Sequence, residues 1–442
     1  MNSRKDNLIA DIKACSSKKG KERAAQYYLY LVGLYIIFVF NEFIKRPVDF
    51  LALVLIIAGL PLINQNNIKS LRATLSHSVA AKVVVWSLVV MSALFILATL
   101  KQLPKYYGLI AFGAQYGVHI GLAAMALLVI PLNNKTTNFL FNCLLLALFA
   151  IVLTDAGFYV WDAKEKIEIS IDHSHRWFGD GYVFLTPFLM AKILSYQGNA
   201  LGQKPFNFAL LEQCALLLLV VILASGTGSR STYVLLALQL LFFTIFLGTQ
   251  YRIRLIPMAL FFLLGVIFFK NYSSFFSATL VDEAFARGFR IWDRVRFAWT
   301  PGVELMLEKP LMGHGFGAGI WNARFSLLQE SSRQAIINYG GPHNWFLSAG
   351  FYGGILGVLS QITFSCGLIT LLLDFPKNFN KLNGDVRIVN KVPYLLYGAL
   401  GAFLSFYLLR GLFESPIYKY LSVILMLGLI INATKLNYEH TI

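Results

Sequence analysis

The sequence contains little charge for its length. Only 14% of its 442 residues are Asp, Glu, Lys or Arg, whereas 57% are hydrophobic. Soluble domains usually carry about 25% charged residues, so this composition excludes an ordinary soluble protein. It is typical of a chain that crosses a membrane repeatedly, because each spanning helix needs about 20 predominantly apolar residues.

The sequence also lacks cysteine motifs and metal-binding motifs. The four cysteines lie in the amino-terminal tail or inside apolar runs and form no CxxC pair, so we expect neither a disulfide nor a thiolate metal site. The stretch Asp172-His173-Ser174-His175 has no third ligand at a set spacing. The sequence therefore predicts no metal and no other cofactor.

The apolar runs predict an all-α polytopic membrane protein with about twelve transmembrane helices. Residues 1–442 are expected to form a single integral membrane domain. Two of the runs are weaker candidates, because 48–63 is short and contains Pro61 and 181–196 contains Pro187 in its interior. The predicted spans are residues 26–44, 48–63, 78–100, 107–131, 137–160, 181–196, 207–225, 231–248, 253–271, 344–373, 392–409 and 416–433.

The net charge of +16 comes from Lys and Arg that lie between apolar runs, so it predicts membrane orientation rather than binding of nucleic acid. Short loops rich in Lys and Arg stay on the cytoplasmic side of a membrane. The basic amino-terminal tail and the loops around Lys69, Lys135, Lys204, Arg252 and Lys377 alternate consistently with this rule. Both termini are therefore predicted to be cytoplasmic.

The same topology places one long loop, residues 272–343, on the outer face, and loops of this length usually carry function. Its centre predicts an amphipathic helix on the membrane surface, followed by a second helix with Thr300 as N-cap and Pro301 in its first turn. The aromatic face of the first helix contains Phe285, Phe289, Trp292 and Trp299, and the opposite face contains Arg287, Arg290 and Arg294.

Several arginines lie on the predicted outer face, against the usual charge bias. Arg230 and Arg410 each stand near glycine at a predicted helix end, where the backbone can approach a ligand closely. A planar guanidinium group can donate two parallel hydrogen bonds to two phosphate oxygens. Several arginines on one membrane face therefore predict a lipid-linked diphosphate as ligand. The alternative is that these side chains extend to the polar membrane interface and bind no ligand. The candidates are Arg176, Arg230, Arg287, Arg290, Arg294 and Arg410.

His343 lies between this loop and the apolar run that begins in GGPHNWFLSAG. A neutral imidazole accepts a proton near pH 7, so His343 is a candidate general base that activates a sugar hydroxyl for attack on an anomeric carbon. Arginines would absorb the charge of a departing diphosphate. The alternative is structural, because Pro342-His343-Asn344 also predicts a helix start with Asn344 as cap.

Other polar features receive structural interpretations. His119 lies inside an apolar run and is expected to serve helix packing, although polar residues inside membranes also mark function. The stretch GHGFGAG, residues 313–319, lacks the strand and helix context of a phosphate loop and is interpreted as a flexible turn near the substrate. The predicted outer loops contain no DxD motif, which argues against a metal-assisted glycosyltransferase.

Two sets of motifs resemble the O-antigen ligase and O-antigen polymerase superfamily of bacterial inner membranes. The first, between Arg294 and Gly357, comprises RVRFAW, LEKPLMGHGFGAG, PHNWFLSAG and GFYGGILG, and the second is TGSRSTYVLL around Arg230. The resemblance implies a metal-independent transferase of the GT-C type with its active site facing the periplasm. The ligases of this family move O-antigen polysaccharide from undecaprenyl diphosphate to lipid A–core.

The resemblance also implies roles for individual residues. His343 corresponds to the family's base, and Arg230 and Arg294 would hold the diphosphate. Independently of the resemblance, Arg290, Arg176, Arg410 and Asn344 are further substrate-binding candidates. The sequence carries one extra residue before Trp299 relative to the common family spacing, which leaves Arg290 and Arg296 as alternatives to Arg294.

Two other functions compete with the ligase. A polymerase shares the lipid donor but accepts a second lipid-linked repeat, and we favour the ligase because one loop carries both Arg294 and His343. A twelve-helix secondary transporter would be built from repeats with binding residues near the membrane midplane. Here no internal repeat is apparent and the polar residues gather at one face.

Overall fold

The computed structural model describes residues 2–41, 45–102, 105–165, 171–195, 208–226, 230–272, 295–332, 340–382, 392–414 and 417–439. Throughout these residues the regular structure is helical and contains no strand, as the sequence predicts. The α-helices are α1 (Asn2–Val39), α2 (Lys45–Gly59), α3 (Gln65–His77), α4 (Val79–Leu100), α5 (Lys105–Phe112), α6 (Val118–Val129), α7 (Asn134–Glu165), α8 (Ile171–Ser195), α9 (Phe208–Gly226), α10 (Arg230–Tyr272), α13 (Thr300–Glu308), α14 (Ala318–Ser332), α15 (Trp345–Leu382), α16 (Val392–Ala402) and α17 (Tyr418–Glu439). Short 3₁₀ or π turns are η2 (Leu60–Leu62), η3 (Gly113–Gly117), η5 (Val295–Trp299), η6 (Phe403–Leu409) and η7 (Arg410–Leu412).

Many of these helices suit a membrane. The described part of the chain has five helices long and apolar enough to cross one, and a pair bent by 105°, Arg46–Leu62 with Gln65–His77, would add a sixth. The prediction of an integral membrane protein is therefore supported, whereas the count of about twelve spans and the GT-C type remain predictions. The five segments are Val79–Leu100, Tyr107–Val129, Asn134–Phe158, Trp345–Leu373 and Tyr394–Leu412.

Two helices extend beyond the predicted spans. α1 begins at Asn2, so helix runs through the basic tail before the span predicted at residues 26–44. α10 covers both spans predicted at 231–248 and 253–271. Residues 249–252, predicted as part of a loop between two spans, are therefore helical in the structure.

The proline in the predicted span 181–196 does not end its helix. Pro187 lies inside α8 and has no N–H to donate to the carbonyl of Val183, one turn earlier. The side chain of Gln239 in α10 donates to that carbonyl at 2.7 Å instead. A neighbouring helix thus satisfies the backbone group that proline leaves open, as hydrocarbon surroundings require.

The glycine-rich stretch 313–319, which the sequence analysis interprets as a flexible turn, is hydrogen-bonded to α15 at the point where that helix is interrupted. α15 is interrupted at Gly354, which has φ +67°. The backbone N–H groups of His314 and Gly315 donate to the carbonyls of Phe351 and Tyr352 at 2.7 and 3.2 Å, and Ile355 donates to Pro310 at 2.6 Å. A Cβ on Gly354 would lie 2.5 Å from the carbonyl oxygen of Pro310, so only glycine allows this contact.

The segment before α13 corrects one local prediction. The π-turn η5 runs directly into α13, and the Thr300 hydroxyl donates back to the carbonyl of Val295 at 2.9 Å. Thr300 is therefore not an N-cap, because the helix is already in progress when the chain reaches it. Pro301 does lie in the first turn of α13, as predicted.

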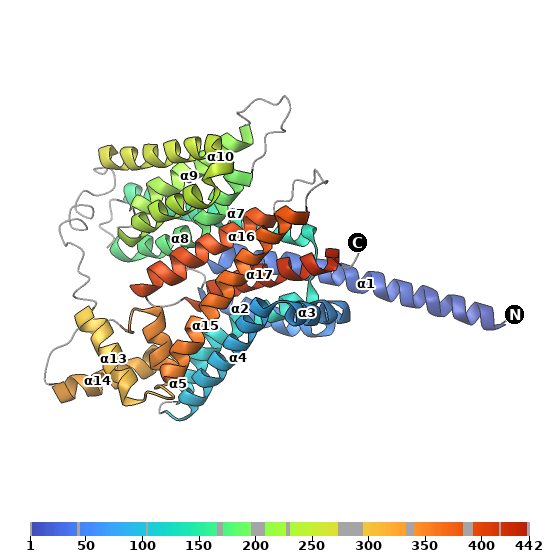
Figure 1. The fold of residues 1–442 in the computed structure, drawn as a ribbon, viewed down its shortest axis with the longest axis horizontal. Helices are drawn as coiled ribbons and strands as arrows, with labels where there is room; N and C mark the ends of the chain where they lie inside the picture. The colour runs from blue at the N-terminus through green and yellow to red at the C-terminus, as the bar shows by residue number, and fades with distance from the viewer. Residues whose placement is uncertain are drawn as a thin grey trace.

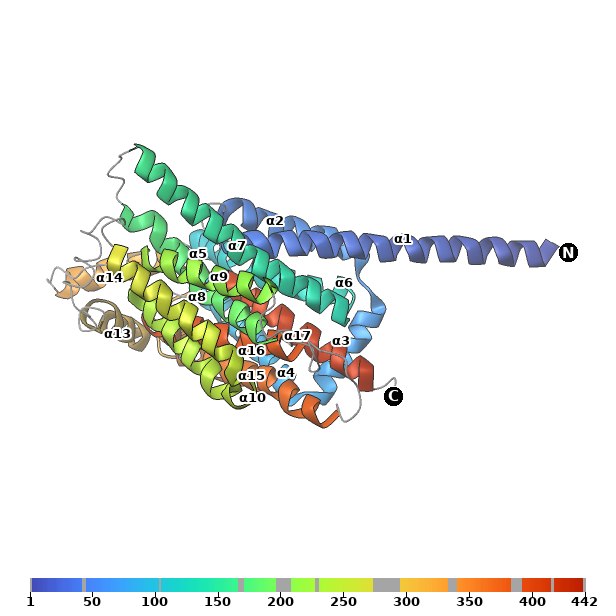
Figure 2. The same ribbon diagram turned by 90° about the horizontal axis from the view of Figure 1, so that it is seen from above.

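The two ends of the helical bundle differ. The start of α1 and the end of α17 lie at one end, whereas α13 and α14 lie at the other, beside α5 and the first part of α15 (Figures 1 and 2). The described helices α13 and α14 of the long loop thus lie at the end opposite to the termini, whereas which end faces the cytoplasm remains a prediction.

Candidate active site

His343 is held in an unusual backbone conformation at the start of α15. Its φ is +46°, a region that residues other than glycine rarely occupy. The next residue caps the helix, because Oδ1 of Asn344 accepts hydrogen bonds from the N–H groups of Phe346 and Leu347, both at 3.0 Å. The predicted helix start with Asn344 as cap is thus confirmed, and the cap fixes the backbone that carries His343.

The imidazole of His343 contacts a carboxylate from the far end of the sequence. Its Nδ1 lies 3.3 Å from Oε2 of Glu414, and the two side chains are 19% and 14% exposed. Because a carboxylate only accepts hydrogen bonds, this contact places the proton of a neutral imidazole on Nδ1 and makes Nε2 the basic nitrogen. Asn344 reinforces the arrangement by donating from Nδ2 to the carbonyl of Leu412 at 3.2 Å.

Arg410 opens the same turn as Glu414. Its carbonyl accepts the N–H of Glu414 at 3.0 Å, and its guanidinium lies 4.8 Å from the centre of the Phe406 ring. The guanidinium also forms an ion pair with Asp180 of α8. Arg410 therefore lies beside the His343–Glu414 pair, with part of its positive charge already balanced by a carboxylate.

Aromatic packing holds the turn against α15. The fully buried Trp345 packs on the rings of Tyr407 and Phe403, with centroids 4.9 and 5.7 Å away. A Cβ on Gly411 would lie 3.2 Å from that of Trp345, so the backbone approaches closely here. On the other side, Trp299 stacks on Phe413 at 5.9 Å.

The structure brings together some of the predicted residues. His343, Asn344 and Arg410 form one constellation. Arg230 begins α10 and Arg176 lies in α8, but their side chains are outside the description, as are the whole of Arg287, Arg290 and Arg294. Arg296 lies in η5, exposed, with its guanidinium 5.3 Å from the centre of the Phe297 ring.

Sequence reasoning missed Glu414 and Asp180. Both lie in segments predicted to face outward, and Glu414 belongs to the stretch LLRGLFESP that includes Arg410. The signal that could have indicated them is the need of a candidate base and of an arginine at a helix end for a carboxylate partner, here Glu414 for His343 and Asp180 for Arg410.

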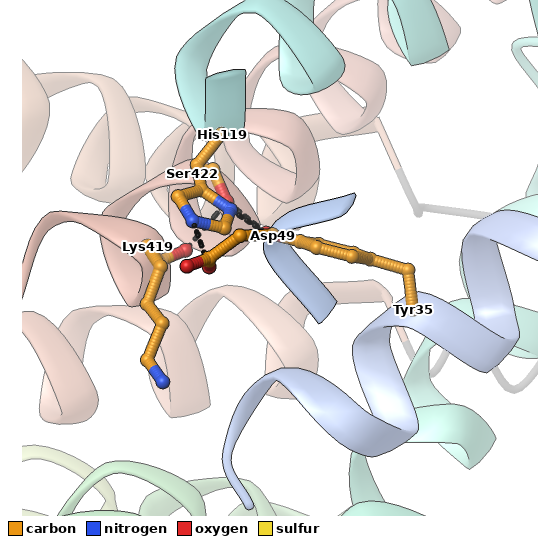
Figure 3. A network of polar contacts seen from close by, with 5 residues as sticks. All are labelled: Tyr35, Asp49, His119, Lys419 and Ser422. Atoms are coloured by element: carbon orange, nitrogen blue, oxygen red, sulfur yellow. Dashed lines mark hydrogen bonds and ion pairs between the residues drawn. The ribbon is translucent and has the colours of Figure 1, made fainter. Parts of the chain in front are cut away.

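A second polar cluster joins four helices near His119 (Figure 3). His119 of α6 accepts or donates at both ring nitrogens, with Nδ1 2.7 Å from the hydroxyl of Tyr35 and Nε2 3.0 Å from Oδ1 of Asp49. The Tyr35 hydroxyl also lies 3.4 Å from Oγ of Ser422 in α17, which donates to the carbonyl of Lys419 at 2.6 Å. The expected packing role of His119 thus includes polar contacts that link α1, α2, α6 and α17.

The described residues include no group of three His, Cys, Asp or Glu side chains placed to hold a metal ion. The side chains of Asp172, His173 and His175 in α8 lie outside this description.

Comparison with known proteins identifies relatives of this chain. Residues 214–362 match the Wzy_C family model, described as O-antigen ligase. The chain is also 21% identical over 410 residues to an O-antigen ligase of Salmonella typhimurium strain LT2, an alignment that covers 87% of this chain and 90% of the relative. The matched segment contains Arg230, Arg294, His343 and Asn344. Residues 214–362 are therefore similar to the O-antigen ligase family, in agreement with the resemblance predicted from the sequence motifs.

Proposed function

We propose that this protein is an O-antigen ligase. It moves O-antigen polysaccharide from undecaprenyl diphosphate to lipid A–core at the periplasmic face of the bacterial inner membrane. The observation that carries the proposal is the pairing of His343 with Glu414 inside the constellation that begins α15. The family match over residues 214–362 supports it.

The chemistry requires one proton transfer and one displacement. Nε2 of His343 takes the proton of the acceptor hydroxyl while Nδ1–H donates to Glu414, as in other carboxylate-oriented histidine bases. The hydroxyl oxygen then bonds to the anomeric carbon of the donor. The bond from that carbon to the diphosphate breaks, and the electron pair leaves on the diphosphate, with inversion of configuration.

Arginines hold the donor in this scheme. Arg230 and Arg294 bind the diphosphate bidentately and take up the charge that develops on it. Arg290, Arg176 and Arg410 supply further positive charge near the substrates. Undecaprenyl diphosphate is itself a good leaving group, so the residues of the chain suffice and the reaction needs no metal.

A transfer assay with two acceptors tests the proposal. The purified protein receives undecaprenyl-diphosphate-linked glycan together with lipid A–core or with a second lipid-linked repeat, in the presence of EDTA. We expect product with lipid A–core; product only with the lipid-linked repeat would make the protein a polymerase, and no product with either would reject the transferase.

The histidine is tested in the same assay. His343→Ala should abolish transfer while membrane insertion and yield stay unchanged, and His77→Ala at the other end of the bundle serves as control. Transfer by His343→Ala at the parental rate would remove His343 from the mechanism.

A further inference from the structure

The layer formed by α13 and α14 exposes leucines at the end of the molecule that carries the candidate active site. The two helices pack around a small core of their own, in which Leu305 and Trp321 meet Phe351 of α15. Outside this core Leu307, Leu311 and Leu327 are 59%, 67% and 55% exposed. Large exposed apolar side chains at this end of the molecule are suited to contact with lipid or with a partner.

These leucines lie where the membrane span α4 ends. Lys101, the residue after α4, places its Nζ 3.1 Å from Sδ of Met312, next to Leu311. Since α4 is long and apolar enough to cross the membrane up to Leu100, the contact sets Leu311 at the level of the membrane surface. Lipid is therefore the natural covering for the exposed leucines.

Three cations border this apolar surface. Lys101 directly follows α4, Lys309 directly follows α13, and Arg324 lies in α14. The guanidinium of Arg324 donates to Oε1 of the buried Gln102 at 2.5 Å, which holds it beside the end of α4. None of the three cations forms an ion pair with a carboxylate of the described residues.

The charges of Lys309 and Arg324 act on each other. Partial burial and the positive charge of Arg324 lower the pKa of Lys309, and Glu308 only partly opposes this shift. Like charges held close together raise the free energy of the protein, and a bound anion removes that repulsion. A guanidinium beside ammonium groups at a membrane surface is suited to phosphate oxygens.

The cation cluster is also fixed relative to His343. A Cβ on Gly302 in α13 would lie 3.2 Å from Cβ of Pro342, the neighbour of His343. Lys309 lies roughly 10 Å farther along the axis of α13 than Gly302, at the usual rise per residue of an α-helix. The turn after Lys309 is tied to α15 by the hydrogen bond from His314 N–H to the carbonyl of Phe351 at 2.7 Å.

We infer that Lys101, Lys309 and Arg324 bind the phosphate groups of the acceptor glycolipid, while the leucines around them contact its acyl chains. This inference rests on the proposed function, because it names the residues that bind the acceptor substrate of that reaction. The acceptor must present a sugar to His343 while its acyl chains remain in the membrane. A phosphate site at the membrane surface, a short distance along α13 from Pro342, holds it in that position.

A binding measurement tests the inference without requiring transfer. The full-length protein is placed in nanodiscs of zwitterionic lipid and titrated with fluorescent bisphosphorylated lipid A or with its dephosphorylated form. The test variant is Lys309→Gln with Arg324→Gln. The matched control is Lys69→Gln with Arg72→Gln, two exposed cations of α3 at the opposite end of the bundle.

We expect the test variant to bind bisphosphorylated lipid A at least about tenfold more weakly than the parent and the control, which is about 1.4 kcal/mol. All three proteins should bind the dephosphorylated lipid equally. Equal affinity of the parent and the test variant for lipid A would overturn the inference. So would equal competition by phosphatidylglycerol, which would make the cluster a general site for anionic phospholipid.

The transfer assay on the same preparation separates the two proposals. Phosphate-dependent binding without any transfer would reject the proposed function and leave the phosphate site standing. Transfer with an unchanged KM for lipid A–core in the test variant would reject the phosphate site alone.

Discussion

The imidazole of His343 and the carboxylate of Glu414 meet across 71 positions of sequence, with Nδ1 and Oε2 3.3 Å apart. Each partner is anchored by its own backbone. Asn344 caps α15 directly after His343, and the carbonyl of Arg410 accepts the N–H of Glu414. The pair is thus preorganised before any substrate binds, as an oriented base requires.

The first prediction concerns the charge of Glu414. Glu414→Gln keeps an oxygen that accepts from Nδ1–H but removes the negative charge that stabilises the imidazolium. We expect kcat to fall about 10²-fold with KM for both substrates nearly unchanged, because the lost interaction acts in the transition state. Steady-state transfer kinetics measure both constants.

Glu304→Gln is the matched control, since Glu304 is an exposed glutamate of α13 on the same side of the molecule. It should leave kcat and KM unaltered. Parental kcat in Glu414→Gln would limit the His343–Glu414 contact to a structural role.

The second prediction concerns the helix cap. Asn344→Ala removes the acceptor for two N–H groups at the start of α15, and we expect a loss of about 1 kcal/mol in the free energy of unfolding. It should also lower kcat, because the backbone that carries His343 is no longer fixed. Asn344→Asp retains the acceptor oxygen but loses the Nδ2 donor to Leu412, so it should recover only part of the stability, measured by denaturation in detergent. Parental stability of Asn344→Ala would contradict the cap.

Much of the architecture could be predicted from local sequence. The apolar runs predict helices at the described spans, and the Pro342-His343-Asn344 pattern predicts the start of α15 with its cap. These features depend on neighbouring residues along the chain, so periodicity and capping preferences suffice to find them.

Features that depend on packing between distant helices could not be predicted in this way. Glu414 reaches His343 because α15 and η7 lie together, and Gln239 reaches Val183 because α10 lies beside α8. The break at Gly354 occurs where a turn some forty residues earlier requires close backbone contact. Neither a proline nor a change in the hydrophobic period of the sequence predicts this interruption of α15.

The third prediction concerns the polar cluster around His119. His119→Leu removes the partner of Asp49 and of Tyr35 from a site where His119 is only 1% exposed. Polar contacts between membrane helices are worth about 1–2 kcal/mol each at most, so we expect a loss of about 2 kcal/mol in stability. Transfer should persist at low temperature, since the cluster is not part of the proposed mechanism.

Ser76→Ala is the control for this variant, because among the described residues the Ser76 hydroxyl bonds to Ala73 within its own helix α3. Thermal unfolding in detergent compares the two. Parental stability of His119→Leu would show that the cluster does not hold the four helices together.

The fourth prediction concerns His314, whose ring is fully buried and stacks on Phe351 with centroids 5.1 Å apart. Burial lowers the pKa of this imidazole from 6.5 to about 4, while the hydrogen bond to the carbonyl of Leu305 opposes the shift and the charges of Arg324 and Lys309 add to it. Below pH 6.5 the unfolded chain therefore gains a proton that the folded protein does not accept until about pH 4. The stability that neutral His314 provides is complete above pH 6.5 and is lost as the pH falls toward 4, by an amount on the order of 2 kcal/mol.

His314→Gln isolates this effect from the titration of other groups. Glutamine cannot be protonated in this range, yet its amide can still donate to the carbonyl of Leu305, so the variant should lose less stability than the parent between pH 6.5 and 4. The measurement is the midpoint of thermal unfolding in detergent at half-unit pH steps, with Ser76→Ala again as control. Parallel pH profiles for the parent and His314→Gln would mean that His314 is protonated equally in the folded and unfolded states. That result would reject the interpretation that a neutral, buried imidazole links α13 to α15.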